Sequence, residues 1–256
     1  MPSPLSGALR FAAYAYPPNA LGYCGPDASH QLLEQVAAGV DDPDLRRLAR
    51  GFEGAWPYLE LIAGANGIRD PLDPRVVEAY WVGNALLDRV GPSLLGDSLE
   101  ARFRGRVGRS WSRLADAVPA GAVPHHSFHV FGIYPWVGLL REGRVDEPLH
   151  VLDRCRVRWG QVLEVRGPQA LVASRPLWWD GRRLLLGEAR PEEVLLRDDG
   201  LGLAGPVAVG DWCSLHWDWV CERLGRRELA ALVRRTADQL AVVNGTTFPA
   251  PAAVLA

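Results

Sequence analysis

Histidine and cysteine are the residues of this chain with the widest chemical use, and three of the six histidines lie close together. The segment PHHSFHVF, residues 124–131, contains His125, His126 and His129. In a helix, His125 and His129 share a face at a spacing of four, as metal ligands on a helix often do, and His126 and His129 do so at a spacing of three. No glutamate follows His125, so the HExxH motif of zinc proteases is absent. The segment therefore suits either a metal site or histidines that cap a helix and form hydrogen bonds.

Two further segments carry candidate ligands in the second half of the chain. Cys155, in LDRCRVRWGQVL, begins what we interpret as a β-strand; it suits a buried apolar residue, a disulfide partner or a metal ligand. His216 and Asp218, in HWDWVC, share one side of a predicted strand, and Trp217 and Trp219 share the other. A carboxylate beside a histidine fixes its tautomer, which serves metal ligation or proton transfer.

Composition limits the classes of protein to consider. The chain has 256 residues, 48% of them hydrophobic, and a formal net charge of −2, which suits neither a nucleic-acid groove nor an anionic membrane surface. All 28 basic residues are arginine, so lysine Schiff bases and the P-loop lysine are excluded. We find neither a secretory signal nor a membrane span, and we expect a cytoplasmic protein with reduced cysteines.

The elements that must position these residues change character near the middle of the chain. Residues 28–117 have helical periodicity, and residues 127–141 form another helical segment with a kink at Pro135. Residues 16–27, YPPNALGYCGPD, predict an ordered loop around Cys24, which suits a reactive thiol, a ligand or a buried side chain. From residue 150, short strands about ten residues apart predict a small barrel or sandwich, followed by a helix over RRELAALVRRTADQLAVVN. The fold class is thus α+β: an all-α domain at 1–148, a linker within 141–148, and an OB-like β-barrel with a closing helix at 149–256.

Part of the second half resembles the HypC-type chaperones of [NiFe]-hydrogenase assembly. That family has a cysteine, a glycine five residues later and a valine two further, as Cys155, Gly160 and Val162 do here. Its later Gly-Asp strand ends in a histidine, as Gly210, Asp211 and His216 do in VGDWCSLH. The resemblance covers about residues 150–244 and includes the closing helix. Cys155 is internal rather than N-terminal, Trp159 stands where that family has proline, and the spacing to His216 is longer.

The resemblance implies that Cys155 and His216 bind iron, which carries carbon monoxide and cyanide ligands in that family. It implies a hydrogenase-maturation factor with other maturation proteins or the hydrogenase large subunit as partners, and no nucleic acid or membrane. His125 and His129 are then candidate ligands at the same site, reaching it from the helical half. The helical domain would dock assembly proteins or act on the iron-bound ligand.

Two other functions remain open from the sequence. One is a non-haem metal enzyme in the helical half that uses His125, His129 and a carboxylate such as Glu53. The other is a metal-free interaction protein with a surface rich in tryptophan, such as Trp178, Trp179, Trp217 and Trp219. Whether the protein is an enzyme is left undecided by the sequence.

Overall fold

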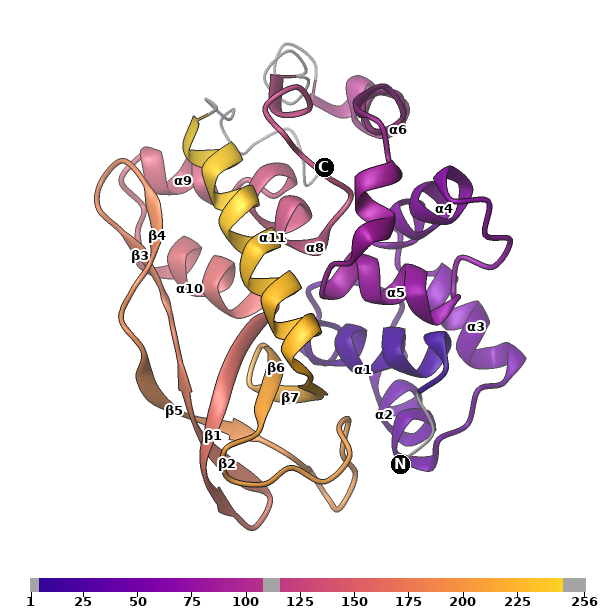
Figure 1. Ribbon diagram of the computed structural model, residues 1–256, viewed down its shortest axis with the longest axis vertical. Helices are drawn as coiled ribbons and strands as arrows, with labels where there is room; N and C mark the ends of the chain where they lie inside the picture. The colour runs from indigo at the N-terminus through magenta and orange to yellow at the C-terminus, as the bar shows by residue number, and fades with distance from the viewer. Residues whose placement is uncertain (1–4, 108–115, 246–256) are drawn as a thin grey trace.

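The computed structural model describes residues 5–107 and 116–245, and it has helices along the first half and strands mostly in the second (Figure 1). The first-half helices are α1 (Gly7–Ala20), α2 (Ser29–Ala38), α3 (Pro43–Arg50), α4 (Trp56–Ala65), α5 (Pro74–Trp81), η1 (Ala85–Arg89) and α6 (Pro92–Val107). They are followed by α8 (His126–Phe128), η3 (His129–Ile133), α9 (Trp136–Arg141) and α10 (Asp146–Cys155). The α+β class predicted from the sequence is confirmed.

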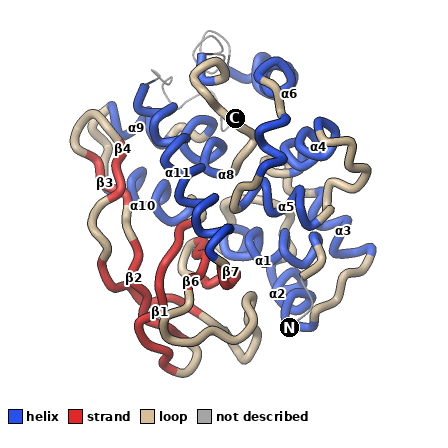
Figure 2. The backbone as a smooth tube through the Cα atoms, viewed as in Figure 1, coloured by secondary structure: helices blue, strands red, loops and turns tan. Residues whose placement is uncertain are grey.

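Seven strands and one long helix make up the rest of the described chain. The strands are β1 (Arg158–Arg166), β2 (Gln169–Ser174), β3 (Leu177–Trp179), β4 (Leu184–Leu186), β5 (Arg190–Leu195), β6 (Trp212–His216) and β7 (Trp219–Leu224). Five of them close into a barrel in the order β1-β2-β5-β7-β6, and β3 pairs with β4 as a separate hairpin. The predicted closing helix is α11 (Arg226–Gly245), which runs across the middle of the molecule between the strands and the helices (Figure 2).

The hydrophobic interior consists of two clusters. The smaller one fills the barrel, with Val162, Val172, Cys213 and Leu215 among its members. The larger one contains residues from both halves, from Tyr14 in α1 to Leu232 in α11. The two predicted domains therefore pack through a common core, and the predicted boundary at 148/149 falls inside α10.

α1 is the main departure from the predicted elements, because residues 16–20 of the expected loop belong to this helix. It contains Pro17 and Pro18, and its side chains are buried nearly all round, so it lacks the one-sided apolar pattern that reveals a surface helix. A proline has no N–H to donate to the carbonyl four residues earlier. Pro18 thus leaves the carbonyl oxygen of Tyr14 without its helical donor. This oxygen is free to accept a hydrogen bond from another part of the chain.

Two smaller departures also affect candidate site residues. Cys155 is the last residue of α10, and β1 begins three residues later, so the cysteine ends a helix instead of opening a strand. Trp217 and Asp218 form the tight turn between β6 and β7, with Trp217 at a positive φ of 51°. The strict alternation expected across residues 216–219 is therefore wrong. No helix in the described part of the chain has both the length and the apolar composition needed to cross a membrane.

Close packing of α1 gives a direct test of this arrangement. A Cβ on Gly7 would lie 1.8 Å from the backbone oxygen of Leu72, so Gly7→Ala forces two backbone segments apart. We expect it to lower the free energy of unfolding by about 3 kcal/mol, the upper range for overpacking. Gly64→Ala in α4 is the matched control: nothing lies within 4 Å of its Cβ, and alanine is the better helix former. Urea unfolding of both variants measures the difference, and equal stabilities would contradict the packing of α1.

Candidate metal centre

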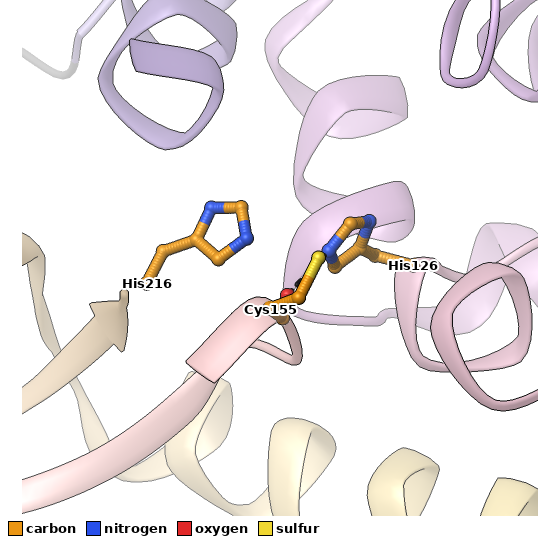
Figure 3. Close-up of side chains that lie close together, drawn as sticks. All are labelled: His126, Cys155 and His216. Carbon is orange, nitrogen blue, oxygen red and sulfur yellow. Dashed lines mark hydrogen bonds between the residues drawn. The ribbon is translucent and has the colours of Figure 1, made fainter. Parts of the chain in front are cut away.

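Three side chains from distant parts of the sequence meet in the interior. His126, Cys155 and His216 each present one potential ligand atom, and these atoms all lie within 4.8 Å of one another (Figure 3). His126 begins α8, Cys155 ends α10 and His216 ends β6. All three are buried, none more than 7% exposed. The described residues thus contain an N, S, N donor set of the kind that binds transition metals.

The hairpin between β6 and β7 brings His216 to Cys155. The backbone N–H of Trp217 donates to the carbonyl oxygen of Arg154 at 2.8 Å, which joins the hairpin turn to the end of α10. The buried Arg158 guanidinium donates to the Trp217 carbonyl oxygen and pairs with Glu192. These contacts fix the turn on both sides, so His216, which precedes the turn, is held next to Cys155, which follows Arg154.

The tautomer of His216 is set by α1. Its Nδ1 donates to the Tyr14 carbonyl oxygen at 2.6 Å, the oxygen that Pro18 leaves free. A histidine that donates from one ring nitrogen to a backbone carbonyl presents the other as a lone pair, as metal-binding histidines do. Nε2 of His216 is buried and has no hydrogen-bond partner. An unpaired buried acceptor is costly, and ligation of a metal would satisfy it.

His126 forms hydrogen bonds through both ring nitrogens. Nε2 lies 2.8 Å from the Cys155 carbonyl oxygen, and Nδ1 lies 3.2 Å from the Tyr80 hydroxyl. Because a carbonyl only accepts, Nε2 carries the proton in this state and Tyr80 donates to Nδ1. A hydroxyl can also accept, so Tyr80 would equally well accept a hydrogen bond from the Nδ1–H when Nε2 binds a metal. His126 can therefore change tautomer without losing its partner at Tyr80.

Burial keeps all three candidate ligands uncharged. Desolvation lowers the pKa of His216 to about 4 and the pKa of His126 well below its usual value. Desolvation also raises the pKa of the Cys155 thiol far above its usual range. The histidines are thus free of competing protons at neutral pH, whereas the cysteine must release its proton to bind a metal.

A cavity of about 200 Å³ adjoins the three ligands. Aromatic side chains form much of its wall, namely Phe52, Tyr80, Trp81, Tyr134 and Trp136. The loop Gly22–Tyr23–Cys24 covers another part, and Tyr23 stacks on Trp217 with 4.5 Å between ring centroids. Three protein ligands leave a coordination position open, and the cavity provides the space for a further ligand there.

Only two of the four ligands predicted from the sequence lie in the cluster. Cys155 and His216 come together, as expected. His129 lines the cavity but is not one of the three clustered residues. His125 belongs to neither: it precedes α8, and its Nδ1 accepts from the Ser127 N–H at 3.1 Å. His126, which the sequence analysis places beside His129 without selecting it as a ligand, takes the third position.

The other candidate residues from the sequence, Cys24, Glu53 and the tryptophans, lie outside the cluster. Cys24 lines the cavity, and burial raises the pKa of its thiol to about 12. Glu53 is exposed. Trp178 is 56% exposed, whereas Trp217 and Trp219 are buried. A continuous tryptophan surface is therefore absent from these described positions, and Glu53 is not part of the buried cluster.

Fold and site together define an α+β protein with a buried His-Cys-His cluster between a closed barrel and a helical half. The chain belongs to the family of unknown function DUF6390, whose family model matches residues 3–250. The match covers both halves, and none of the comparisons supports the HypC-type resemblance of residues 150–244. No curated protein and no solved structure matches the chain.

Proposed function

We propose that this protein binds one transition-metal ion through His126, Cys155 and His216. The observation that carries the proposal is the convergence of three buried donor atoms within 4.8 Å, one of which, His216 Nε2, has no other partner. The Tyr14 carbonyl and the Tyr80 hydroxyl supply the outer hydrogen bonds that orient the two imidazoles. One thiolate with two imidazoles favours iron, zinc or copper over magnesium or calcium.

Iron in [NiFe]-hydrogenase assembly is the more specific proposal. The HypC-type spacing selects one of four cysteines and one of six histidines, and these two are in the cluster. The two motifs also lie on paired strands: Gly160 of β1 is opposite Cys213 of β6, and the Gly210 N–H donates to the Val162 carbonyl oxygen at 2.8 Å. A thiolate suits a low-spin iron centre, and the apolar cavity would exclude bulk water from it.

Burial of the ligands bears on how the metal would be handled. Cys155 is fixed at the end of a helix, and the site is enclosed by α1, α8, α10 and β6. A chaperone that passes iron on needs an accessible ligand, which an N-terminal cysteine provides. We therefore propose that this chain retains the iron while its other ligands are added or changed, with the helical half as one wall of the site.

Metal analysis with paired histidine variants tests the binding proposal. Protein purified without oxygen is expected to contain about one metal ion per chain. His126→Asn should lose it, because one of three ligands is removed. His125→Asn should retain it, since asparagine is a good helix N-cap and the His125 side chain caps α8 and lies outside the cluster. Metal lost with His125→Asn but retained with His126→Asn would instead support the non-haem metal enzyme that uses His125 and His129.

An infrared spectrum and a maturation assay test the specific proposal. Protein from a host that makes hydrogenase should show bound iron with carbonyl or cyanide stretching bands. Deletion of its gene in its own host should lower [NiFe]-hydrogenase activity, and the wild-type gene should restore it better than one encoding Cys155→Ala. Bound metal without these bands, together with normal hydrogenase activity after deletion, would contradict the hydrogenase role but not metal binding.

A further inference from the structure

The cavity contains a polar group that the three-ligand site does not use. His129 is 5% exposed and lines the cavity, and its Nδ1 is buried without a hydrogen-bond partner. Its ring neighbours are aromatic: it meets Tyr58 and Tyr134 edge-on, with 5.6 Å and 4.7 Å between ring centroids. A buried ring nitrogen without a partner loses the hydrogen bond it had in water, so its presence in an apolar wall requires an explanation.

The position of His129 indicates what it could contact. Its ring centroid lies 6.4 Å from that of His126, and the planes of the two rings are inclined by 27°. His126 and His129 line the same cavity, and with a metal–nitrogen bond of about 2 Å and a hydrogen bond of about 2.9 Å a ligand of a few atoms can reach from a metal on His126 to the His129 ring. His129 is too far away to join the cluster directly, and near enough to reach the distal end of a short ligand.

The size of the cavity also favours a small ligand. A water molecule in the liquid takes about 30 Å³, so the cavity of about 200 Å³ has the volume of about seven such molecules, and a cavity of about 150 Å³ already holds benzene. The cavity thus suits a small molecule and is small for a nucleotide or a peptide. The aromatic wall offers few other polar partners, so a ligand there would be polar mainly at its ends.

We propose that the cavity binds a small linear ligand of two or three atoms, which coordinates the metal at one end and accepts a hydrogen bond from His129 at the other. The inference rests on the proposed metal site, because the ligand would occupy its open position. Burial keeps His129 neutral, so one ring nitrogen carries a proton to donate. His129 is a positioning residue for the ligand and not a metal ligand.

Gly54, which also lines the cavity, lies against the His129 ring. A Cβ on Gly54 would lie 3.1 Å from Nε2 of His129, which is closer than the ring can accept without moving. The absence of a side chain at this position thus makes room for the imidazole. Gly54→Ala displaces the ring while leaving its chemistry intact, and so provides a second way to test its role.

Azide binding to cobalt-loaded protein tests the proposal, with azide as the linear probe. Visible and infrared spectra would follow the azide titration, and metal analysis would accompany every variant. His129→Leu is expected to retain the metal, to bind azide about tenfold more weakly and to shift the azide stretching band, as loss of one hydrogen bond requires. His129→Gln, which still has a donor, should recover part of both effects. Gly54→Ala should weaken binding by a smaller factor, and His30→Leu, at an exposed histidine on α2, should change nothing.

The results separate this inference from the metal site itself. A wild-type azide band that moves in deuterated water would support a hydrogen bond even if His129→Leu failed to fold. Metal-loaded protein whose azide affinity and band are the same with histidine and leucine at position 129 would overturn the inference and leave the metal site standing. Metal-loaded wild-type protein that does not bind azide would also overturn it. Protein that never binds a metal would overturn both proposals.

Discussion

Replacing Cys155 by alanine is expected to lower the metal affinity by at least about 100-fold. Loss of an outer hydrogen bond to a metal ligand alone costs roughly 10- to 100-fold, and this variant removes a ligand. The thiolate also supplies the only negative charge that the three clustered residues can provide. Competition with a chromophoric chelator would measure the affinity, and a cobalt-loaded sample would show the loss of the sulfur-to-metal absorption band.

Cys213→Ala is the matched control for this variant. Cys213 is also a buried free thiol, but it lies inside the barrel, outside the cavity. Both variants create a small void, so a general effect of destabilisation would appear in both. Unchanged affinity in Cys155→Ala, or equal losses in the two variants, would refute ligation by Cys155. His216→Ala should match Cys155→Ala, because it removes the nitrogen that has no other partner.

Cys155 and His216 could be selected from the sequence because the resemblance rests on short spacings within strands. Gly160, Val162, Gly210 and Asp211 place β1 beside β6, and a β-ladder fixes which residues meet at its end. Two of the three clustered residues, Cys155 and His216, were thus selected through the resemblance, and His126 was not. The sequence does not reveal that Cys155 ends α10 and that β1 begins only at Arg158. The spacing from Cys155 to Gly160 and Val162 is the same whether the cysteine ends a helix or begins a strand.

The third ligand was not distinguished because PHHSFHVF is not one regular helix. Its helical interpretation places His125 and His129 on a common face. In the structure His125 precedes a three-residue α8, and a π-helix follows from His129 to Ile133. These changes of winding turn His126 toward Cys155 instead. Spacing rules hold only where the helix type is constant, and nothing in eight residues reveals a change from α to π winding.

Another feature missed from the sequence is α1, whose role is to complete the site. Its buried surface gives no amphipathic signal, and its two prolines indicate a loop by composition. The tertiary contacts override that indication: the Tyr14 hydroxyl donates to Ser214 at 2.8 Å, and Arg10 pairs with Glu78 at 2.9 Å and with Glu222. Pro18 then acquires a role in the site, since the carbonyl it leaves free orients His216.

Acid should unfold the metal-free protein steeply, because four histidines are buried in neutral form. Desolvation lowers the pKa of His125 and His129 to about 3 and of His216 to about 4, and it holds that of His126 well below its usual value. In the unfolded chain each has a pKa near 6.5. The unfolded state therefore binds up to about four more protons than the folded state at pH values between these limits.

These pKa values determine whether the free energy of unfolding rises or falls with pH. A group whose pKa is depressed by folding contributes its full stability above about pH 6.5, and loses that contribution as the pH falls toward the folded value. Each group changes the free energy of unfolding by about 1.4 kcal/mol per pH unit, so four together change it by up to about 5.5 kcal/mol per pH unit. A domain with about 5–15 kcal/mol of stability should then unfold within a few pH units of neutrality.

Urea unfolding at a series of pH values, with a chelator present, measures the slope. The informative range is pH 6.5 to 5, because it lies above the pKa values of ordinary carboxylates. His125→Asn should reduce the slope by one proton, since it removes one buried histidine and retains the cap of α8. His30→Gln should leave it unchanged, because that side chain is 82% exposed. A slope of one proton or fewer in the parent protein would mean that these imidazoles are solvated, and it would remove the physical basis for a dry metal site.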